Sequence, residues 1–142
     1  MIGTSIFSML SALNTSVALG LANDNGTLRI YPNYVKMEDD KTVAQQLVFD
    51  QENYQADGSL DGNPQTASID MKIMAIDPTY TEASNLARAI ATALDQTRGT
   101  WGTTTVQACY VDEISESHFI DTDMSTILYY ISEITCKVKF VL

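Results

Sequence analysis

Two acidic stretches of the sequence contain residue types that bind metal ions or transfer protons. The first, Asp57-Gly-Ser-Leu-Asp61-Gly62, matches the opening of a calcium-binding loop, where alternate positions supply oxygen ligands and a glycine follows. The twelfth position, however, is Ser68, where such a loop needs a bidentate glutamate, and the flanking patterns are those of strands rather than helices. The stretch therefore predicts a polar turn with no bound metal.

The second acidic stretch holds His118, the only histidine, near Glu116 and Asp121. These three residues could form an acid–base or metal cluster, but one histidine does not make a zinc site, and no serine or cysteine nucleophile is apparent. The chain also lacks a Walker-type loop, a Gly-x-Gly-x-x-Gly motif and a Gly-x-Ser-x-Gly elbow. We therefore expect no catalytic residue, no cofactor and no metal, and a protein that is not an enzyme.

Three aromatic residues are candidates for anchoring protein–protein contacts, because aromatic side chains are enriched in interface cores. Trp101, the only tryptophan, lies between two glycines, and Tyr129 and Tyr130 are adjacent in the sequence. The same side chains are also ordinary core residues, and we expect at least one of the tyrosines to be buried in the core.

Hydrophobic periodicity predicts the elements that position these residues. Apolar residues alternate with polar ones over much of Ala67–Asp77, which predicts a half-buried strand. Pro78 suits a first helical turn, and Thr79 with Glu82 predicts a capping box. Helical spacing then continues through Ala83, Leu86, Ala87, Ile90 and Leu94. We expect this strand and helix to be the scaffold on which the rest of the chain packs.

The other elements follow from the same patterns. We predict a helix over Ser5–Leu19 and strands over Thr27–Tyr31, Val43–Asp50, Val106–Tyr110 and Ile134–Leu142. Loops are predicted over Gln51–Pro64, as the tip of a hairpin, and over Gln96–Thr105 and Asp112–Ser125. The order predicts one α+β domain over residues 1–142, with a mostly antiparallel sheet of about five strands and two helices packed on one face.

The charge balance limits the partners of the chain. With 18 acidic and 8 basic residues, the net charge of −10 is unsuited to gripping DNA or RNA, although it allows DNA to slide past. The apolar run Ile2–Leu21 lacks a basic leader and is interrupted by Ser, Thr and Asn, so no membrane span is expected. Cys109 and Cys136 are expected to be free and buried, although two cysteines also permit a disulfide.

Two short motifs carry a resemblance to a known family. Arg29-Ile-Tyr-Pro32 precedes a strand of the type Leu47-Val-Phe49, and Tyr80-Thr-Glu-Ala-Ser-Asn-Leu-Ala87 opens the second helix. With the N-terminal helix, the polar hairpin tip, the acidic loop and the terminal strand in the same order, the chain resembles the tail-terminator (tail-completion) proteins of long-tailed bacteriophages and gene-transfer particles. One departure is the segment Lys41–Gln46, where members of this family often have a proline.

The resemblance implies a structural virion protein of the tail-neck region, assembled in the host cytoplasm. It implies a homo-hexameric ring that caps the tail tube protein, ends tube polymerisation and joins the head connector or neck protein, with DNA passing through the lumen without specific binding. A ring repeats a heterologous interface, so each subunit needs two different surfaces. The candidate interface residues are Asp57, Asp61, Trp101, Asp112, Glu113, Glu116, Asp121 and Asp123.

Two other functions remain open at this point. The first is a head-side neck or connector adaptor protein of the same particle, which would share the small size, ring symmetry and acidic loops. The second is a small enzyme or ligand-binding α+β domain, which requires His118 to converge with Asp121 and Asp123 in a pocket.

Overall fold

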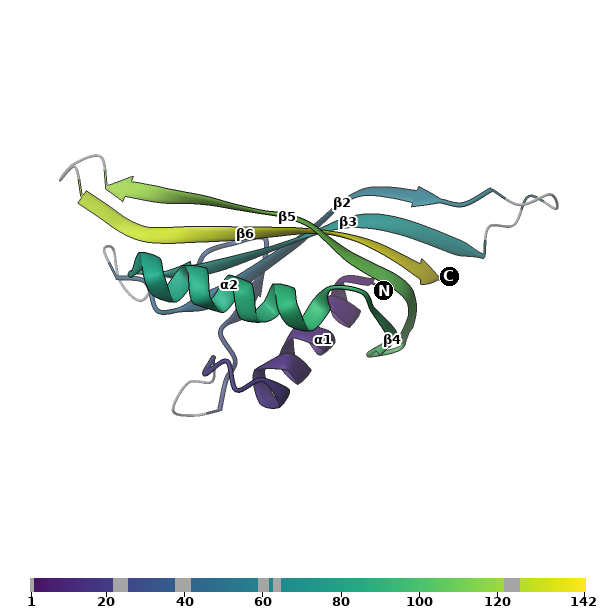
Figure 1. The fold of residues 1–142 in the computed structure, drawn as a ribbon, viewed down its shortest axis with the longest axis horizontal. Coiled ribbons are helices and arrows are strands. Elements are labelled where there is room, and N and C mark those ends of the chain that lie inside the picture. The colour runs from purple at the N-terminus through teal and green to yellow at the C-terminus, as the bar shows by residue number, and fades with distance from the viewer. Residues whose placement is uncertain (1, 22–25, 38–41, 59–61, 63–64, 122–125) are drawn as a thin grey trace.

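The structure, a computed structural model, describes residues 2–21, 26–37, 42–58, 62, 65–121 and 126–142. Two helices lie against one face of a twisted sheet (Figure 1). The helices are α1 (Ile2–Ser16) and α2 (Tyr80–Leu94). The strands are β1 (Ile30–Pro32), β2 (Gln46–Ala56), β3 (Thr66–Asp77), β4 (Thr97–Trp101), β5 (Thr104–Asp121) and β6 (Thr126–Val141). Within these ranges, no helix is both long and apolar enough to cross a membrane.

The sheet differs from the predicted one in the number of its strands and in the direction of one strand pair. Among the described residues it has six strands in the order β1-β2-β3-β6-β5-β4, and β1 runs parallel to β2, with Ile30 opposite Leu47. The predicted sheet of about five mostly antiparallel strands is therefore wrong in its count and in omitting the parallel pair. The strand missed altogether is β4, because its Gly99 and the following Gly102 signalled a loop. Gly99 instead follows an irregularity within β4, and Gly102 lies in the turn of the β4–β5 hairpin.

The main hydrophobic core lies between the sheet and both helices. The inward side chains of β3 are at most 2% exposed, which confirms the alternation predicted for this strand. They pack in one cluster with Ile6 and Leu10 of α1 and with Leu86 and Ile90 of α2. Burying a side chain of this type stabilises the fold by about 1.5–3 kcal/mol, so this cluster fixes both helices on the same face.

The start of α2 is held differently from the prediction. Thr79 is the N-cap residue, but its side chain makes no capping hydrogen bond, so the predicted capping box with Glu82 is wrong. Instead, Asp77 Oδ1 accepts a hydrogen bond from the backbone N–H of Thr79 at 2.7 Å. Because Asp77 is the last residue of β3, this local turn links the strand directly to the helix.

The helix α1 approaches the β4–β5 turn closely. Gly102 has a φ of +57°, and a Cβ atom there would lie 3.2 Å from Ser8 Oγ of α1. The hydroxyls of Ser5 and Thr104 are hydrogen-bonded at 2.6 Å beside this contact. Glycine is therefore favoured at position 102 both by the backbone conformation and by the neighbouring helix.

The opposite face of the sheet, here called the outer face, carries a smaller apolar cluster that contains Val48, Ile76 and Tyr129. The segment after β1 covers part of it, because the buried side chain of Gln46 binds the backbone of Lys36. Gln46 Oε1 accepts a hydrogen bond from Lys36 N at 2.8 Å, and Gln46 Nε2 donates one to Lys36 O at 2.9 Å. Part of the outer face is thus covered by the segment that follows β1.

Candidate assembly surfaces

Two pairs of strands extend toward opposite ends of the molecule and carry most of the predicted site residues (Figure 1). The β5–β6 arm consists of residues 111–121 and 126–136, and the β2–β3 arm of residues 50–58 and 65–72. Loops were predicted over Asp112–Ser125 and Gln51–Pro64, but 112–121 and 51–56 are strand, so these predictions are wrong there. The segments are mostly polar on both faces, which is why no apolar alternation marked them.

The acidic residues of the β5–β6 arm are exposed and do not converge. Asp112, Glu113 and Glu116 lie in a continuous run of exposed residues. Glu113 is opposite Thr135 in the ladder and Glu116 is opposite Ser132, so the two glutamates point to different faces of the sheet. Carboxylates on opposite faces cannot hold one ligand together, so Glu113 and Glu116 do not form a shared binding site.

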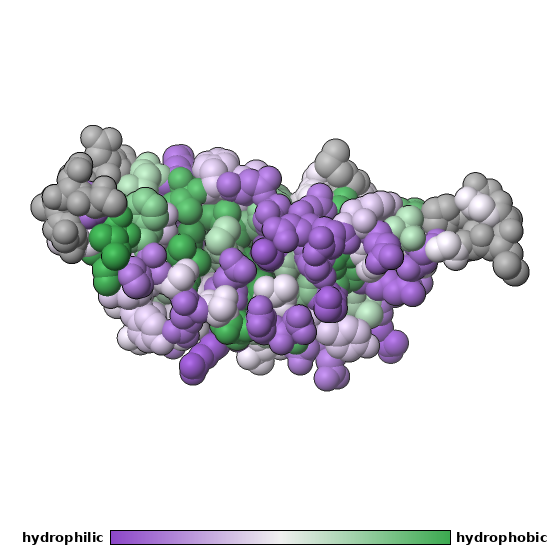
Figure 2. All heavy atoms as spheres, turned by 90° about the horizontal axis from the view of Figure 1, so that it is seen from above, coloured by the Kyte–Doolittle hydropathy of each residue, from purple (hydrophilic) through white to green (hydrophobic). Residues whose placement is uncertain are grey.

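The end of the β5–β6 arm carries an apolar patch, formed by the stacked pair Phe119 and Tyr129 on the outer face and by the neighbouring Ile120 and Ile127. The rings of Phe119 and Tyr129 are stacked, and Ile120 lies opposite Ile127 after an irregularity that separates it from Phe119 in the ladder. Phe119 is 49% exposed, and Ile120 and Ile127 are each 43% exposed. Figure 2, which views this face, shows hydrophobic residues gathered at this end of the molecule and polar residues over its centre.

The helix side of the same arm contacts Tyr80, the first residue of α2. Tyr80 and Tyr130 make an edge-to-face contact with ring centroids 5.7 Å apart, and the ring of His118 lies 6.4 Å from that of Tyr130. A hydrogen bond to the Glu116 carboxylate raises the pKa of Tyr80. His118 therefore has an aromatic neighbour, and the described residues contain no group of three His, Cys, Asp or Glu side chains placed to hold a metal ion.

The outer face of the β2–β3 arm is charged, and its charges are paired. Lys72 binds Glu52 at 3.2 Å, and Lys137 of the neighbouring β6 binds Asp70 at 3.3 Å. Asn53 Nδ2 also donates to Asp70 Oδ2 at 2.6 Å, and this hydrogen bond is the main reason why the pKa of Asp70 is lowered. Exposed ion pairs of this kind contribute little stability, but they leave this surface close to neutral.

The described part of the calcium-like stretch behaves as a structural turn. The Asp57 carboxylate accepts a hydrogen bond from the Thr66 hydroxyl, which is the main cause of its lowered pKa, and it pairs with Lys139 at 3.4 Å. Ser68, at the position of the missing bidentate ligand, is in β3 opposite Gln55. The stretch is therefore flanked by strands, as predicted, and its best-placed carboxylate already has partners.

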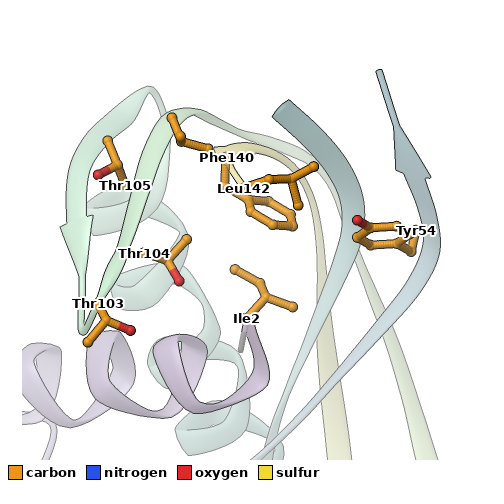
Figure 3. A pocket seen from close by; sticks show the side chains of 8 residues that line it. Ile2, Tyr54, Thr103, Thr104, Thr105, Phe140 and Leu142 are labelled. Atoms are coloured by element: carbon orange, nitrogen blue, oxygen red, sulfur yellow. The ribbon is translucent and has the colours of Figure 1, made fainter. Parts of the chain in front are cut away.

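A hollow of about 560 Å³ opens between the base of the β2–β3 arm and the β4–β5 hairpin. Figure 3 shows the ring of Tyr54 on one side, threonines of the hairpin on the other, and Ile2, Phe140 and Leu142 between them. No titratable side chain other than the Tyr54 phenol lines it. Phe140 is ten positions along β6 from Tyr130, the ladder partner of His118, so the histidine does not reach this hollow.

The two cysteines are free and fully buried, as predicted. Cys109 is opposite Val138 and Cys136 is opposite Val111, which places the thiols diagonally on the core side of β5 and β6. Contact with the Cys109 thiol and burial both raise the pKa of Cys136. Both thiols are fully buried in the main core cluster, so this pair is part of the core packing.

The fold has a counterpart among solved structures. The chain superposes with a TM-score of 0.61 on a chain of the structure described as "Virion of native gene transfer agent (GTA) particle". This chain shares its fold with a gene transfer agent virion protein. The similarity covers 89% of this chain and 91% of the other, at 11% sequence identity. Neither family models nor curated protein sequences match the chain.

The predicted interface residues fall in different environments within this fold. Trp101 is 7% exposed and belongs to the main core, in keeping with the core alternative left open by its sequence. Asp61 and Asp123 lie outside the described residues. The residues exposed or half-buried on the two arms are Asp57, Asp112, Glu113, Glu116 and Asp121.

Sequence reasoning missed the apolar patch at the end of the β5–β6 arm. Its only signal was the dipeptide Phe119-Ile120 inside a polar, acidic stretch. A large apolar pair in a segment predicted as an exposed loop indicates either a buried strand or a contact surface, and the pairing with Ile127 and Tyr129 was needed to show which.

Proposed function

We propose that this chain is a structural protein of a phage-like or gene-transfer particle and not an enzyme. The observation that carries the proposal is the match over 89% of the chain to a gene transfer agent virion chain. The two motifs that carry the tail-terminator resemblance lie at the starts of elements in this chain: Arg29–Pro32 leads into and forms β1, and Tyr80 begins α2.

Within such a particle, the proposed assembly is a homo-hexameric ring at the tail-neck junction. The ring caps the tail tube protein, ends tube polymerisation and joins the tail to the head connector or neck protein. The molecule has the two dissimilar surfaces that a heterologous ring contact requires, because the β5–β6 arm is apolar at its end whereas the β2–β3 arm is ion-paired.

The charge of the chain supports a lumen through which DNA moves. Tight binding to a phosphate backbone requires clusters of Lys and Arg, and this chain has 8 basic residues against 18 acidic ones. A ring of such subunits repels DNA rather than binding it. The subunits would assemble in the host cytoplasm and remain in the tail-neck region of the finished particle.

Deletion of the gene in a particle-producing host tests the proposal. We expect tails of irregular length, or tails that do not join heads, in negative-stain images. Light scattering of purified protein, alone or with isolated tail tubes, is expected to show a mass near six chains of 15.6 kDa. Normal tails attached to normal heads after deletion would overturn the proposal. A tag seen at the head vertex, with an unlabelled tube end, would instead assign the chain as a neck or connector adaptor.

A further inference from the structure

The distal part of β5 has no partner strand on one side. β4 pairs with β5 only between Thr104 and Cys109, whereas β6 pairs with β5 along nearly its whole length. Within the described ranges, no second strand pairs with the segment Tyr110–Ile120. This edge contains no proline and no lysine, two residues that commonly protect open edges, and its free part begins after Val111, whose backbone N–H donates to Asp95 Oδ1 at 3.1 Å. Such an edge presents backbone N–H and C=O groups to another strand.

The strand β2 has an open edge on the opposite side of the sheet. β1 pairs with β2 only at Leu47, Val48 and Phe49. Beyond these residues, the segment Asp50–Ala56 pairs with β3 alone among the described strands. The sheet therefore has two long open edges, one at each side, and they belong to different strands.

Strand direction makes these two edges compatible between copies related by rotation about one axis. The order β2-β3-β6-β5 is antiparallel at every step. If the next copy is placed beside β5 in the same orientation, its β2 runs antiparallel to that β5. The alternation then continues from copy to copy, which is the arrangement that a closed ring of strands needs.

The positions of the edges along the strands determine which residues meet. β1 already occupies the β2 edge as far as Phe49, so an incoming strand has room only beyond that residue. The β5–β6 arm extends beyond Tyr130, the last residue of β6 that pairs with β3. The end of β5 therefore protrudes from the rest of the sheet and can reach the free edge of β2 in another copy. This geometry pairs the distal end of β5 with Asp50–Ala56 and staggers successive copies along the strands, as in barrels with tilted strands.

Charge and area agree with such a contact. The acidic β5–β6 arm would meet a surface whose acids Glu52 and Asp70 are already paired with lysines, so repulsion there is small. The free edge of β2 is seven residues, or about 24 Å, long at ~3.4 Å per residue, and an irregularity between Glu52 and Gln55 interrupts it. With a width of about 10 Å, this strip is well below the ~800 Å² per partner of a stable interface, so the apolar patch must add contact area. A single contact is therefore weak, and ring closure stabilises it because each copy is then held twice.

We propose that copies of this chain join by β-sheet extension, with the distal edge of β5 in one copy pairing antiparallel with the Asp50–Ala56 edge of β2 in the next. The apolar patch of Phe119, Ile120, Ile127 and Tyr129 lies beside this seam and is covered by the neighbouring copy. The inference rests on the proposed ring and names the partner of each arm. It assigns the contact to backbone edges and apolar side chains rather than to the acidic residues.

Cross-linking between two variant chains tests this seam. Ser117→Cys introduces a thiol at an exposed position on distal β5, and Gln55→Cys introduces one on the open part of β2. The native Cys109 and Cys136 have no exposed surface, so a short bis-maleimide reaches only the introduced thiols. In a mixture of the two variants, under conditions where light scattering shows assembly, we expect a dimer that contains one chain of each kind.

A matched control separates the seam from random collision. Gln107→Cys is exposed on β5 within the stretch that β4 covers, and it should give no product with Gln55→Cys. Equal yields from Ser117→Cys and Gln107→Cys would overturn the inference. Cross-linking of Ser117→Cys only to itself would show a twofold contact between two β5 edges and would also overturn it. Assembly without either cross-linked product would overturn the proposed strand pairing but not the proposed ring. A complete lack of assembly, alone or on tail tubes, would overturn both proposals.

Discussion

The ring of Phe119 stacks on that of Tyr129 across the β5–β6 ladder, with centroids 5.2 Å apart and an angle of 5° between the planes. Tyr129 is 7% exposed and packs in the outer-face cluster with Val48 and Ile76, whereas Phe119 is 49% exposed. The pair therefore joins the covered part of the outer face to the open apolar patch. A large exposed aromatic ring beside an open strand edge is typical of a surface that another chain covers.

Replacing Phe119 by alanine should weaken both the fold and the assembly. Loss of the stack with Tyr129 is expected to lower the free energy of unfolding by about 0.5–1.5 kcal/mol, measured by urea denaturation. Tyr80→Ala is the matched control, because it removes the contact with Tyr130 on the helix side of the same arm. Only Phe119→Ala should reduce the assembled fraction in light scattering, and equal losses in both variants would contradict a role for the outer face.

Ile120→Lys should prevent assembly while leaving the monomer folded. Ile120 is 43% exposed, so the change should alter the free energy of unfolding by no more than about 0.5 kcal/mol. The protein has a net charge of −10, so an added lysine lowers the repulsion between copies, and a loss of assembly would come from the patch itself.

Ile114→Lys is the control for that experiment. Ile114 is 40% exposed and lies opposite Ile134, a core residue, and therefore on the helix side of the same strand. It introduces the same charge on the same arm away from the apolar patch. Retention of assembly in Ile114→Lys and loss in Ile120→Lys is the expected pair of results by light scattering; the reverse pattern would place the contact at the middle of the arm rather than at its end.

The pKa values of Asp57 and Asp70 predict a loss of stability in acid. Both are lowered in the folded protein, mainly by hydrogen bonds from Thr66 and Asn53 respectively. The folded pKa lies below 3.8, the ordinary value for an aspartate, so this stabilisation is present above pH 3.8 and is lost as the pH falls through the folded pKa. Urea midpoints should therefore decrease between about pH 6 and about pH 3.

Asp70→Asn tests the source of that pH dependence. The variant removes one titrating carboxylate and its ion pair with Lys137, so its urea midpoint should fall less between the same two pH values than that of the parent protein. The difference should be small because the side chain is near the surface. An unchanged pH profile would show that Asp70 does not contribute to the acid sensitivity.

Gly102→Ala should destabilise the protein more than Gly20→Ala. Both glycines have positive φ values, +57° and +73°, so either alanine carries a backbone cost of about 1–2 kcal/mol. Only at position 102 does the added Cβ meet a neighbour, 3.2 Å from Ser8 Oγ, whereas position 20 is open. Thermal or urea unfolding measures the difference, and equal losses would show that α1 moves away without cost.

Sequence reasoning succeeded where local pattern and burial agree. The alternation in Ala67–Asp77 and the helical spacing from Ala83 to Leu94 were sufficient to predict β3 and α2, because each element buries one face against the same core. Burial of the two cysteines followed for the same reason. The capping box failed because Asp77 bonds the Thr79 backbone in its place.

The sequence by itself determined the central strand, the two helices and an acidic surface unsuited to binding nucleic acid. Only the tertiary structure decided that Thr97–Trp101 is a strand, that β1 is parallel to β2, and that the acidic loops are largely strand. It also separated Glu113 from Glu116 onto different faces and brought Phe119 against Tyr129. The physical reason is that pairing between strands joins residues distant in the chain, and an arm exposed on both faces leaves no periodic pattern in its own sequence.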